Sequence, residues 1–133
     1  LCIIYLICMK GLEFVFLGVG GILGTFLRYK ILETQILFHF IPVNALIVNV
    51  LGSFILGIFL VTSIHYNIDG RYALFAAVGF CGSLTTFSAF ALDNSTLLDN
   101  SQYGIMFVNV IANVGLAIGA LFAGKTLMNS ILN

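Results

Sequence analysis

Apolar residues dominate this chain in four long runs, and short polar stretches separate them. A bilayer core of about 30 Å needs roughly 20 apolar residues in a helix, and each run comes close to that length. The breaks are clear, because Pro42 precedes the second run, residues 65–71 follow it, and residues 93–102 separate the third run from the fourth. The pattern predicts four transmembrane helices, near residues 11–28, 43–64, 72–92 and 103–124.

The segments outside these helices are less regular. Residues 29–40 alternate apolar and polar side chains, which is typical of a helix that lies in the membrane interface. Residues 1–8 are apolar and precede Met9, so we interpret them as either a mis-called start or an N-terminal extension. No soluble domain or tandem repeat is evident, and residues 1–133 are interpreted as a single membrane domain.

The composition also indicates a membrane protein. Hydrophobic residues make up 61% of the 133 residues and charged residues only 8%, against about 25% in soluble domains. So few polar side chains could not cover the core of a soluble fold, and lipid has to cover part of it. The net charge is zero and no basic stripe is present, which argues against a nucleic-acid partner. The sequence contains no evident nucleophile–base pair of the kind that would indicate an enzyme.

The positive charges are almost evenly divided between the two sides of the membrane. Four spans put both chain ends on one side, which would carry Lys10, Arg71 and Lys125, while the other side would carry Arg28 and Lys30. This three-to-two balance gives little orientation signal. We expect the chain to insert both ways round and to be able to pair with an inverted copy of itself, although one extra charge could also suffice to orient it.

Several glycines have the spacing of helix contacts. Gly20 and Gly24 form a small-xxx-small pair in the first run, Gly115 and Gly119 form another in the fourth, and Gly52 lies in the second. Small residues let helix backbones approach closely in lipid, where the hydrophobic effect does not drive association. We predict that these glycines serve helix packing in a compact bundle or dimer.

Polar residues inside the spans are the candidates for function, because polar groups in lipid are costly unless they face protein or water. Asn49 and Ser53 share one face of the second helix, and Asn109 and Asn113 repeat this spacing in the fourth. Such uncharged groups fit either interhelical hydrogen bonding or an uncharged permeation track. The residues alone leave both open.

The third run contains an unusual stretch, GFCGSLTTFSAF at residues 79–90. Glycine, serine and threonine near the middle of a span can break a helix, because their side chains re-satisfy the freed backbone groups. A break exposes carbonyl and N–H groups as ion ligands. Phe87 and Phe90 follow on one face, where their positive ring edges could meet a small anion or the rings could simply pack.

Four stretches together resemble the Fluc (CrcB-type) fluoride channel family. They are GGxxGxxxRY at residues 20–29, Pro42 with VNxxGSFxxG at residues 48–57, GFCGSLTTFSxF at residues 79–90, and the glycine-bearing fourth run. The third stretch is the most specific, and the resemblance covers nearly the whole chain from Met9 onward. It implies a fluoride-selective channel of the cell membrane that exports fluoride by passive permeation and so relieves fluoride toxicity.

The resemblance also implies an all-helical antiparallel homodimer of inverted subunits, with two fluoride pores. A structural sodium ion would lie at the dimer centre, held by backbone carbonyls of Gly82 and Thr85 in a break of the third helix. No further cofactor is implied.

Carried over by position, the pore residues follow. Asn49 would be the amide that donates to fluoride, Phe87 and Phe90 the aromatic pair that lines the pore, and Ser88 part of the polar track. Arg28 would lie near the aqueous vestibule.

Three positions depart from the family's pattern. Ala45 and Ala89 stand where threonine is frequent, and Phe107 stands where tyrosine is usual. Each loses a hydroxyl that could line the pore. A paralogous partner that supplies the missing groups is therefore an alternative to the homodimer.

Two other classes remain as alternatives. A small multidrug-resistance-type proton-coupled transporter also has four short spans and dual insertion, but it needs a membrane-embedded carboxylate. Glu13 is the only candidate, and it lies three residues after Lys10. A structural membrane subunit would leave the stretch at residues 79–90 unexplained.

Overall fold

The structure, a computed structural model, describes residues 11–34, 37–38 and 41–132. Residues 1–8, interpreted above as a start or an extension, lie outside this range. The elements are α2 (Gly11–Glu33), β1 (Leu37–Phe38), β2 (Ile41–Pro42), α3 (Asn44–His65), α4 (Gly70–Ala73), the π-helical segment η1 (Leu74–Cys81), α5 (Gly82–Leu84), α6 (Phe87–Asp99) and α7 (Tyr103–Leu132).

Four helical stretches in the described residues are long and apolar enough to cross a membrane. They are Gly11–Glu33, Asn44–His65, Gly70–Asp99 and Tyr103–Leu132. The four predicted spans are therefore confirmed, and the third span, Gly70–Asp99, comprises α4, η1, α5 and α6.

The link between the first two spans differs from the prediction. Residues 29–33 continue α2, where Lys30 and Glu33 form an i,i+3 ion pair of 3.0 Å near the helix end. The interfacial helix predicted over residues 29–40 is wrong for the described part of this segment. β1 and β2 instead pair as antiparallel strands, with Phe38 opposite Ile41. Pro42 accordingly lies in β2, and α3 begins at Asn44.

The third span extends seven residues beyond its predicted end. Asn94 and Thr96 donate side-chain hydrogen bonds to the carbonyls four residues earlier, those of Phe90 (2.7 Å) and Leu92 (3.0 Å). These polar side chains are thus satisfied on the helix itself, and α6 continues to Asp99 instead of ending at residue 92.

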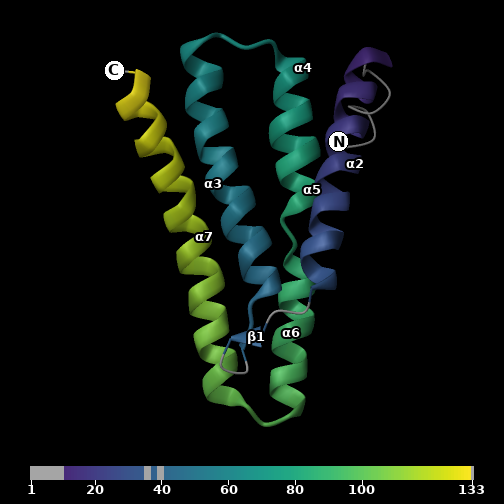
Figure 1. Cartoon of the computed structure of the whole chain (residues 1–133), viewed down its shortest axis with the longest axis vertical. Coiled ribbons are helices and arrows are strands. Elements are labelled where there is room, and N and C mark those ends of the chain that lie inside the picture. The colour runs from purple at the N-terminus through teal and green to yellow at the C-terminus, as the bar shows by residue number, and fades with distance from the viewer. Residues whose placement is uncertain (1–10, 35–36, 39–40, 133) are drawn as a thin grey trace, which may run out of the picture.

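The helices pack as two closely associated pairs (Figure 1). α3 lies along α7, and α2 lies along η1 and α5. The start of α2, the turn between α3 and α4 and the end of α7 lie at one end of the bundle, and the β1–β2 hairpin and the turn between α6 and α7 lie at the other. At the first of these ends, Asp69 caps α4, and its hydrogen bond from the Arg71 guanidinium lowers the pKa of the Asp69 carboxyl.

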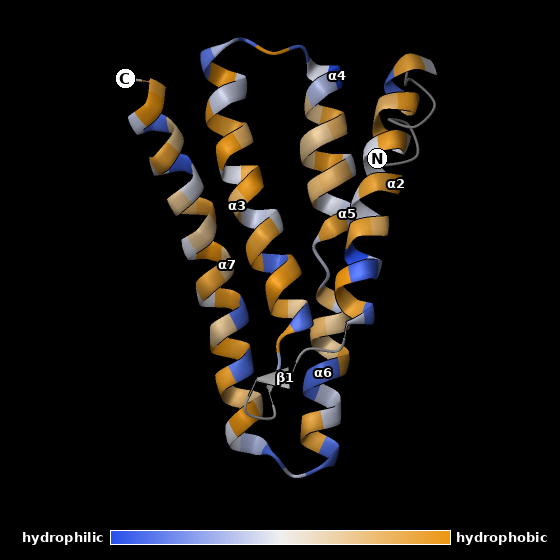
Figure 2. Cartoon of the chain, in the orientation of Figure 1, coloured by the Kyte–Doolittle hydropathy of each residue, from blue (hydrophilic) through white to orange (hydrophobic). Residues whose placement is uncertain are grey.

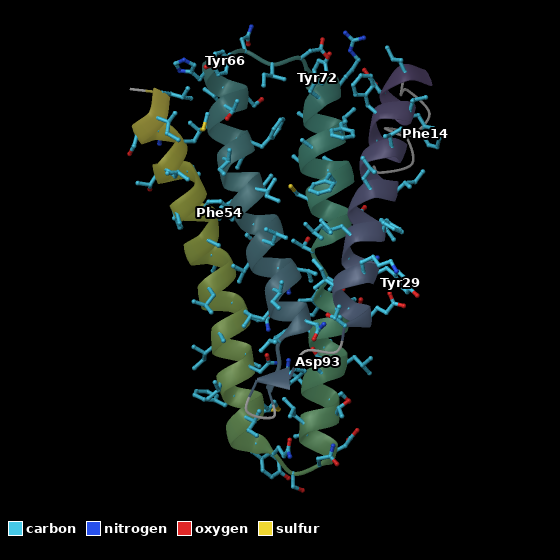
Figure 3. All side chains as sticks on the ribbon, in the orientation of Figure 1. Phe14, Tyr29, Phe54, Tyr66, Tyr72 and Asp93 are labelled. Atoms are coloured by element: carbon cyan, nitrogen blue, oxygen red, sulfur yellow. The ribbon has the colours of Figure 1, made fainter. Side chains whose placement is uncertain are left out.

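The outer surface is apolar along the helices. Many large hydrophobic side chains are exposed, Ile22 by 71% and Ile64 by 82%. Figure 2 shows hydrophobic residues along most of the long helices and hydrophilic residues gathered at the turns. Tyr72 lies at the end of the bundle where α4 begins (Figure 3). Its ring meets Phe16 of α2 edge-to-face, with centroids 5.3 Å apart. Such a surface is suited to lipid and not to water.

Glycines bring the α3 and α7 backbones together. A Cβ atom on Gly57 would overlap the carbonyl oxygen of Leu121, and one on Gly124 would overlap the carbonyl oxygen of Phe54. The contact is reciprocal, because each helix contributes one glycine and one carbonyl. No side chain fits between the two helices at this level.

The glycines predicted to pack helices differ in whether they contact another helix. A Cβ on Gly20 or Gly24 would overlap the carbonyl oxygens of Phe75 and Phe80, respectively. Gly115 and Gly119, however, are exposed, with no neighbouring atom within 4 Å of a Cβ placed there. A packing role for this second pair would need another chain.

The close approach at Gly124 predicts that Gly124→Ala destabilises the bundle. The added methyl group meets backbone that cannot rotate away, and overpacking of this kind costs about 1–3 kcal/mol. Unfolding in mixed detergent micelles, followed by circular dichroism, measures the effect. Gly104→Ala on the same helix is the matched control, because a Cβ there meets nothing within 4 Å. Equal stability of the two variants would contradict the contact.

Candidate functional site

Two residues of the third span have extended backbone. Thr85 (φ −71°, ψ 150°) and Thr86 (φ −147°, ψ 118°) lie between α5 and α6, and Figure 1 shows the non-helical stretch they form. Thr86 caps α6, because its side-chain oxygen accepts the Ala89 N–H at 3.3 Å. Threonine suits both roles, since it favours extended backbone and is a good N-cap.

Asn49 of α3 satisfies the backbone of Thr86. Its Oδ1 accepts the Thr86 N–H at 2.7 Å, and its Nδ2 donates to the Thr86 carbonyl at 3.2 Å. One amide side chain thus bonds both backbone groups, as a neighbouring strand would. In a continuous helix the Thr86 N–H would instead bond to the carbonyl of Gly82, which is released from that bond here.

Gly52 makes room for this arrangement on α3. It lies one turn from Asn49, and a Cβ at Gly52 would overlap Cγ2 of Thr85. Gly52, predicted as a packing glycine, therefore lies against the extended residues.

The remaining N–H of the Asn49 amide points to α7. Nδ2 also donates to Oδ1 of Asn113 at 3.0 Å. Both N–H groups of Asn49 thus have acceptors within the chain. An anion could receive a hydrogen bond from Asn49 only by replacing one of them.

A cavity of about 360 Å³ lies beside this cluster. None of its lining residues carries a charged side chain. The lining includes the predicted pore residues Asn49, Phe87 and Phe90, together with Gly82 and Thr85, whose carbonyls the resemblance assigned to sodium. The two phenylalanine rings are tilted by 56°, with centroids 5.3 Å apart. Phe90 is 9% exposed and Phe87 is 78% exposed, so the described residues leave most of the Phe87 side chain uncovered.

Ser88 and Arg28 line a second cavity, of about 710 Å³. Thr86 lines both cavities and stands between the two groups of predicted residues. Its hydroxyl lies 3.1 Å from that of Ser88. The predicted pore residues are therefore divided between two adjacent hollows that share one threonine.

The three departures from the family's pattern lie in different surroundings. Ala89 lines the second cavity, Ala45 is completely buried, and Phe107 is 64% exposed. Of the three, Ala89 is the one that lines a cavity described above, and a hydroxyl there would reach it.

Glu13 lies elsewhere. It lines a separate cavity with Asp69 and Arg71, beside the turn between α3 and α4. The first cavity has no carboxylate among its lining residues.

Asn94, a half-buried polar residue of α6, was not singled out from the sequence. Asn94 accepts a hydrogen bond from Asn109 of α7 at 3.2 Å, whereas the sequence pattern assigned it to a polar separator. The signal was present in the spacing, because Phe90, Asn94 and Leu97 fall at i, i+4 and i+7 on one helix face, and both apolar members are buried.

The chain was compared with known proteins. The family model "CrcB-like protein, Camphor Resistance (CrcB)" matches residues 15–125. The fluoride-specific ion channel FluC of Nitrosopumilus maritimus (strain SCM1) is 63% identical over 125 residues, which cover 94% of this chain and 99% of that protein. The protein of the same name from Methanococcus maripaludis is 37% identical over 113 residues, covering 85% of this chain and 93% of its own.

These matches extend over most of the chain and include all four spans. The protein is a multi-pass membrane protein, and it belongs to the CrcB family.

Proposed function

We propose that this chain is a fluoride channel, which exports fluoride from the cell by passive permeation and so relieves fluoride toxicity. Its relatives match it over nearly their whole length, and they carry the name fluoride-specific ion channel. The observation that carries the proposal is the uncharged cavity where Asn49, Phe87 and Phe90 meet beside the extended residues Thr85 and Thr86.

The chemistry of this cavity suits a small, strongly hydrated anion. A pore must replace the water around fluoride with hydrogen-bond donors, and amide and hydroxyl groups do so without a fixed charge that would trap the ion. Fluoride would replace the Thr86 carbonyl, the more distant of the two acceptors, as the acceptor of one Asn49 N–H. Hydrogen bonds to ions are roughly twice as strong as neutral ones, which favours this exchange, while the bond from the Thr86 N–H and the bond to Asn113 would hold the amide in place.

The aromatic pair would contribute through its ring edges. A phenylalanine ring has a positive edge, and the tilted rings of Phe87 and Phe90 lie on the wall of the same cavity as Asn49. The half-buried Arg28 would attract anions from water into the second cavity, because the Glu33 carboxylate on the same wall is paired with Lys30 at 3.0 Å. The hydroxyls of Ser88 and Thr86 would then lead toward the first cavity.

The proposed assembly is an antiparallel homodimer of inverted subunits in the cell membrane. The small difference in Lys and Arg between the two sides supports dual insertion. The exposed Phe87 ring and the exposed pair Gly115 and Gly119 offer surfaces that a second copy could cover. A paralogous partner with inverted orientation would satisfy the same surfaces.

A structural sodium ion fits the backbone of the extended segment. The Gly82 carbonyl lacks its helical donor because the Thr86 N–H bonds to Asn49. The Thr85 carbonyl lacks its own because the Ala89 N–H bonds to the Thr86 hydroxyl. Hard cations prefer such oxygens, and two inverted copies would double their number. The ion would supply fixed positive charge that holds the two extended segments together.

A proton-coupled transporter is less well supported. Glu13 lies in the cavity beside Asp69 and Arg71. The longer third span also contains Asp93, but neither carboxylate lines the cavity of Asn49. A structural subunit leaves the polar cavity without a purpose.

The proposed function predicts selective fluoride flux. Proteoliposomes that hold the purified chain should release fluoride much faster than chloride, because only the smaller ion gains enough from close hydrogen bonds to replace its water. Ion-selective electrodes measure both fluxes on one preparation, and protein-free liposomes are the control. Equal fluxes of the two ions would defeat the channel assignment.

The aromatic role predicts loss of flux in Phe87→Ile and in Phe90→Ile. Near-isosteric apolar changes usually cost less than about 1.5 kcal/mol of stability, so the fold should survive while the positive ring edge is lost. Size exclusion in detergent reports the assembly, and fluoride efflux reports the pore. Normal assembly with normal flux in both variants would return the rings to a packing role.

The assembly predicts two orientations in one membrane. A reporter fused after Asn133 should give a signal on both sides, and two lysines added near one end should shift the population and lower flux, since an inverted partner becomes scarce. A single orientation with full activity would rule out the inverted homodimer.

The proposed sodium site predicts that exchange of sodium for potassium weakens the dimer in size exclusion. A dimer that is indifferent to sodium would remove the ion from the proposed assembly.

A further inference from the structure

Four asparagines from three helical elements form one unbroken series of hydrogen bonds, which we call the asparagine relay. Asn49 donates to Asn113 at 3.0 Å, Asn113 to Asn109 at 3.2 Å, and Asn109 to Asn94 at 3.2 Å, each from Nδ2 to Oδ1. The series begins and ends on the backbone of the third span. Asn49 accepts the Thr86 N–H at 2.7 Å, and Asn94 donates to the Phe90 carbonyl at 2.7 Å.

These two backbone ends fix the direction of the relay. A backbone N–H can only donate, so Thr86 requires the oxygen of Asn49. A backbone carbonyl can only accept, so Phe90 requires the NH₂ group of Asn94. Every amide between them must then present its oxygen toward Asn49 and its NH₂ group toward Asn94. Reversal of any one amide would set two donors or two acceptors against each other.

Burial makes such a reversal costly. Asn109 is completely buried, and Asn113 is 4% exposed. Asn109 has no surface that water could reach, and a buried group without its partner is strongly disfavoured. Asn113 lines the uncharged cavity, but both of its neighbours oppose a reversal, because Asn49 presents an N–H to it and Asn109 presents an oxygen. The inner members are held in one orientation by the two ends.

We propose that Asn94 is a positioning residue for Asn49, which acts through Asn109 and Asn113. Asn94 does not line the cavity beside Asn49. Its side chain bonds to the Phe90 carbonyl of its own helix and to Asn109, and the bond to Asn109 is its hydrogen-bonded connection to the Asn49 amide. A functional consequence rests on the proposed channel activity, because a donor held in one orientation meets the ion without first having to reorganise. The relay itself does not depend on that activity.

The test combines a remote variant with a matched control. Asn94→Leu removes the acceptor of Asn109 and should change the side-chain amide signals of Asn109, Asn113 and Asn49 in NMR spectra of the asparagine-labelled chain in micelles. Asn100→Leu is the control. Asn100 caps the C-terminal end of α6 and, like Asn94, donates to the carbonyl four residues earlier, that of Thr96 at 2.8 Å, but its side chain is exposed. It should leave the Asn49 signal unchanged.

Fluoride efflux from liposomes provides the second readout. Asn94→Leu should lower the flux about tenfold, as expected for the loss of roughly one net hydrogen bond of orientation, while Asn100→Leu keeps it. Asn94→Asp keeps an oxygen for the Asn109 amide, and water can reach this half-buried position, so both the Asn49 signal and the flux should return toward the original values.

The two hypotheses fail in different ways. An Asn49 signal that does not move in Asn94→Leu overturns the relay, whether or not the original chain conducts fluoride. Signals that move together in a chain without fluoride flux would support the relay and sink the proposed function. If Asn94→Leu does not fold, amide exchange in the original chain decides: slow side-chain exchange at all four relay positions with fast exchange at Asn100 supports the relay, and fast exchange at Asn109 or Asn113 overturns it.

Discussion

The bundle depends on satisfying the backbone of Thr86 away from water. An extended residue in the middle of a membrane span exposes an N–H and a carbonyl that the helix no longer bonds, and lipid cannot bond them either. The Asn49 side chain carries one acceptor and two donors, so it can meet both groups at once. The extended conformation of the third span is therefore tied to one residue on α3, and α3 must lie close enough for that side chain to reach.

Glycine contacts provide this closeness. Gly52 lets α3 approach Thr85, while Gly57 and Gly124 fix α3 against α7 without intervening side chains. Because Asn109 and Asn113 lie on α7, the same packing brings their amides within reach of Asn49 and Asn94. Backbone contact and polar bonding thus depend on each other. The helices approach because small residues allow it, and the polar groups are satisfied because the helices approach.

The sequence predicted the four spans well, because about 20 consecutive apolar residues leave little choice of structure. It was less successful at the polar edges. Residues 93–102 were taken as a separator, although Asn94 and Thr96 satisfy themselves on the helix and α6 continues to Asp99. Residues 29–40 were assigned to an interfacial helix, although residues 29–33 extend α2. Composition cannot distinguish a polar residue that ends a helix from one that bonds to the preceding turn.

The same limit applies to the site. Spacing along one helix put Asn49 with Ser53 and Asn109 with Asn113, and the resemblance brought Asn49 together with Phe87 and Phe90, which line one cavity with it. The sequence could not show that Asn49 bonds Thr86, or that Asn94 completes the series, because those partners come from other helices. Nor could it show that Ser88 and Arg28 line a neighbouring cavity instead of the first one.

The single direction of the four amides also has an evolutionary meaning. Aspartate at Asn113 would offer an oxygen to Asn49 but would turn a second one toward the oxygen of Asn109, and serine there would fall short of one neighbour. A single substitution at either inner position, Asn109 or Asn113, therefore passes through a mismatched intermediate, while a coordinated change at both positions does not. Descendants of this sequence should keep this inner pair or replace both of its members.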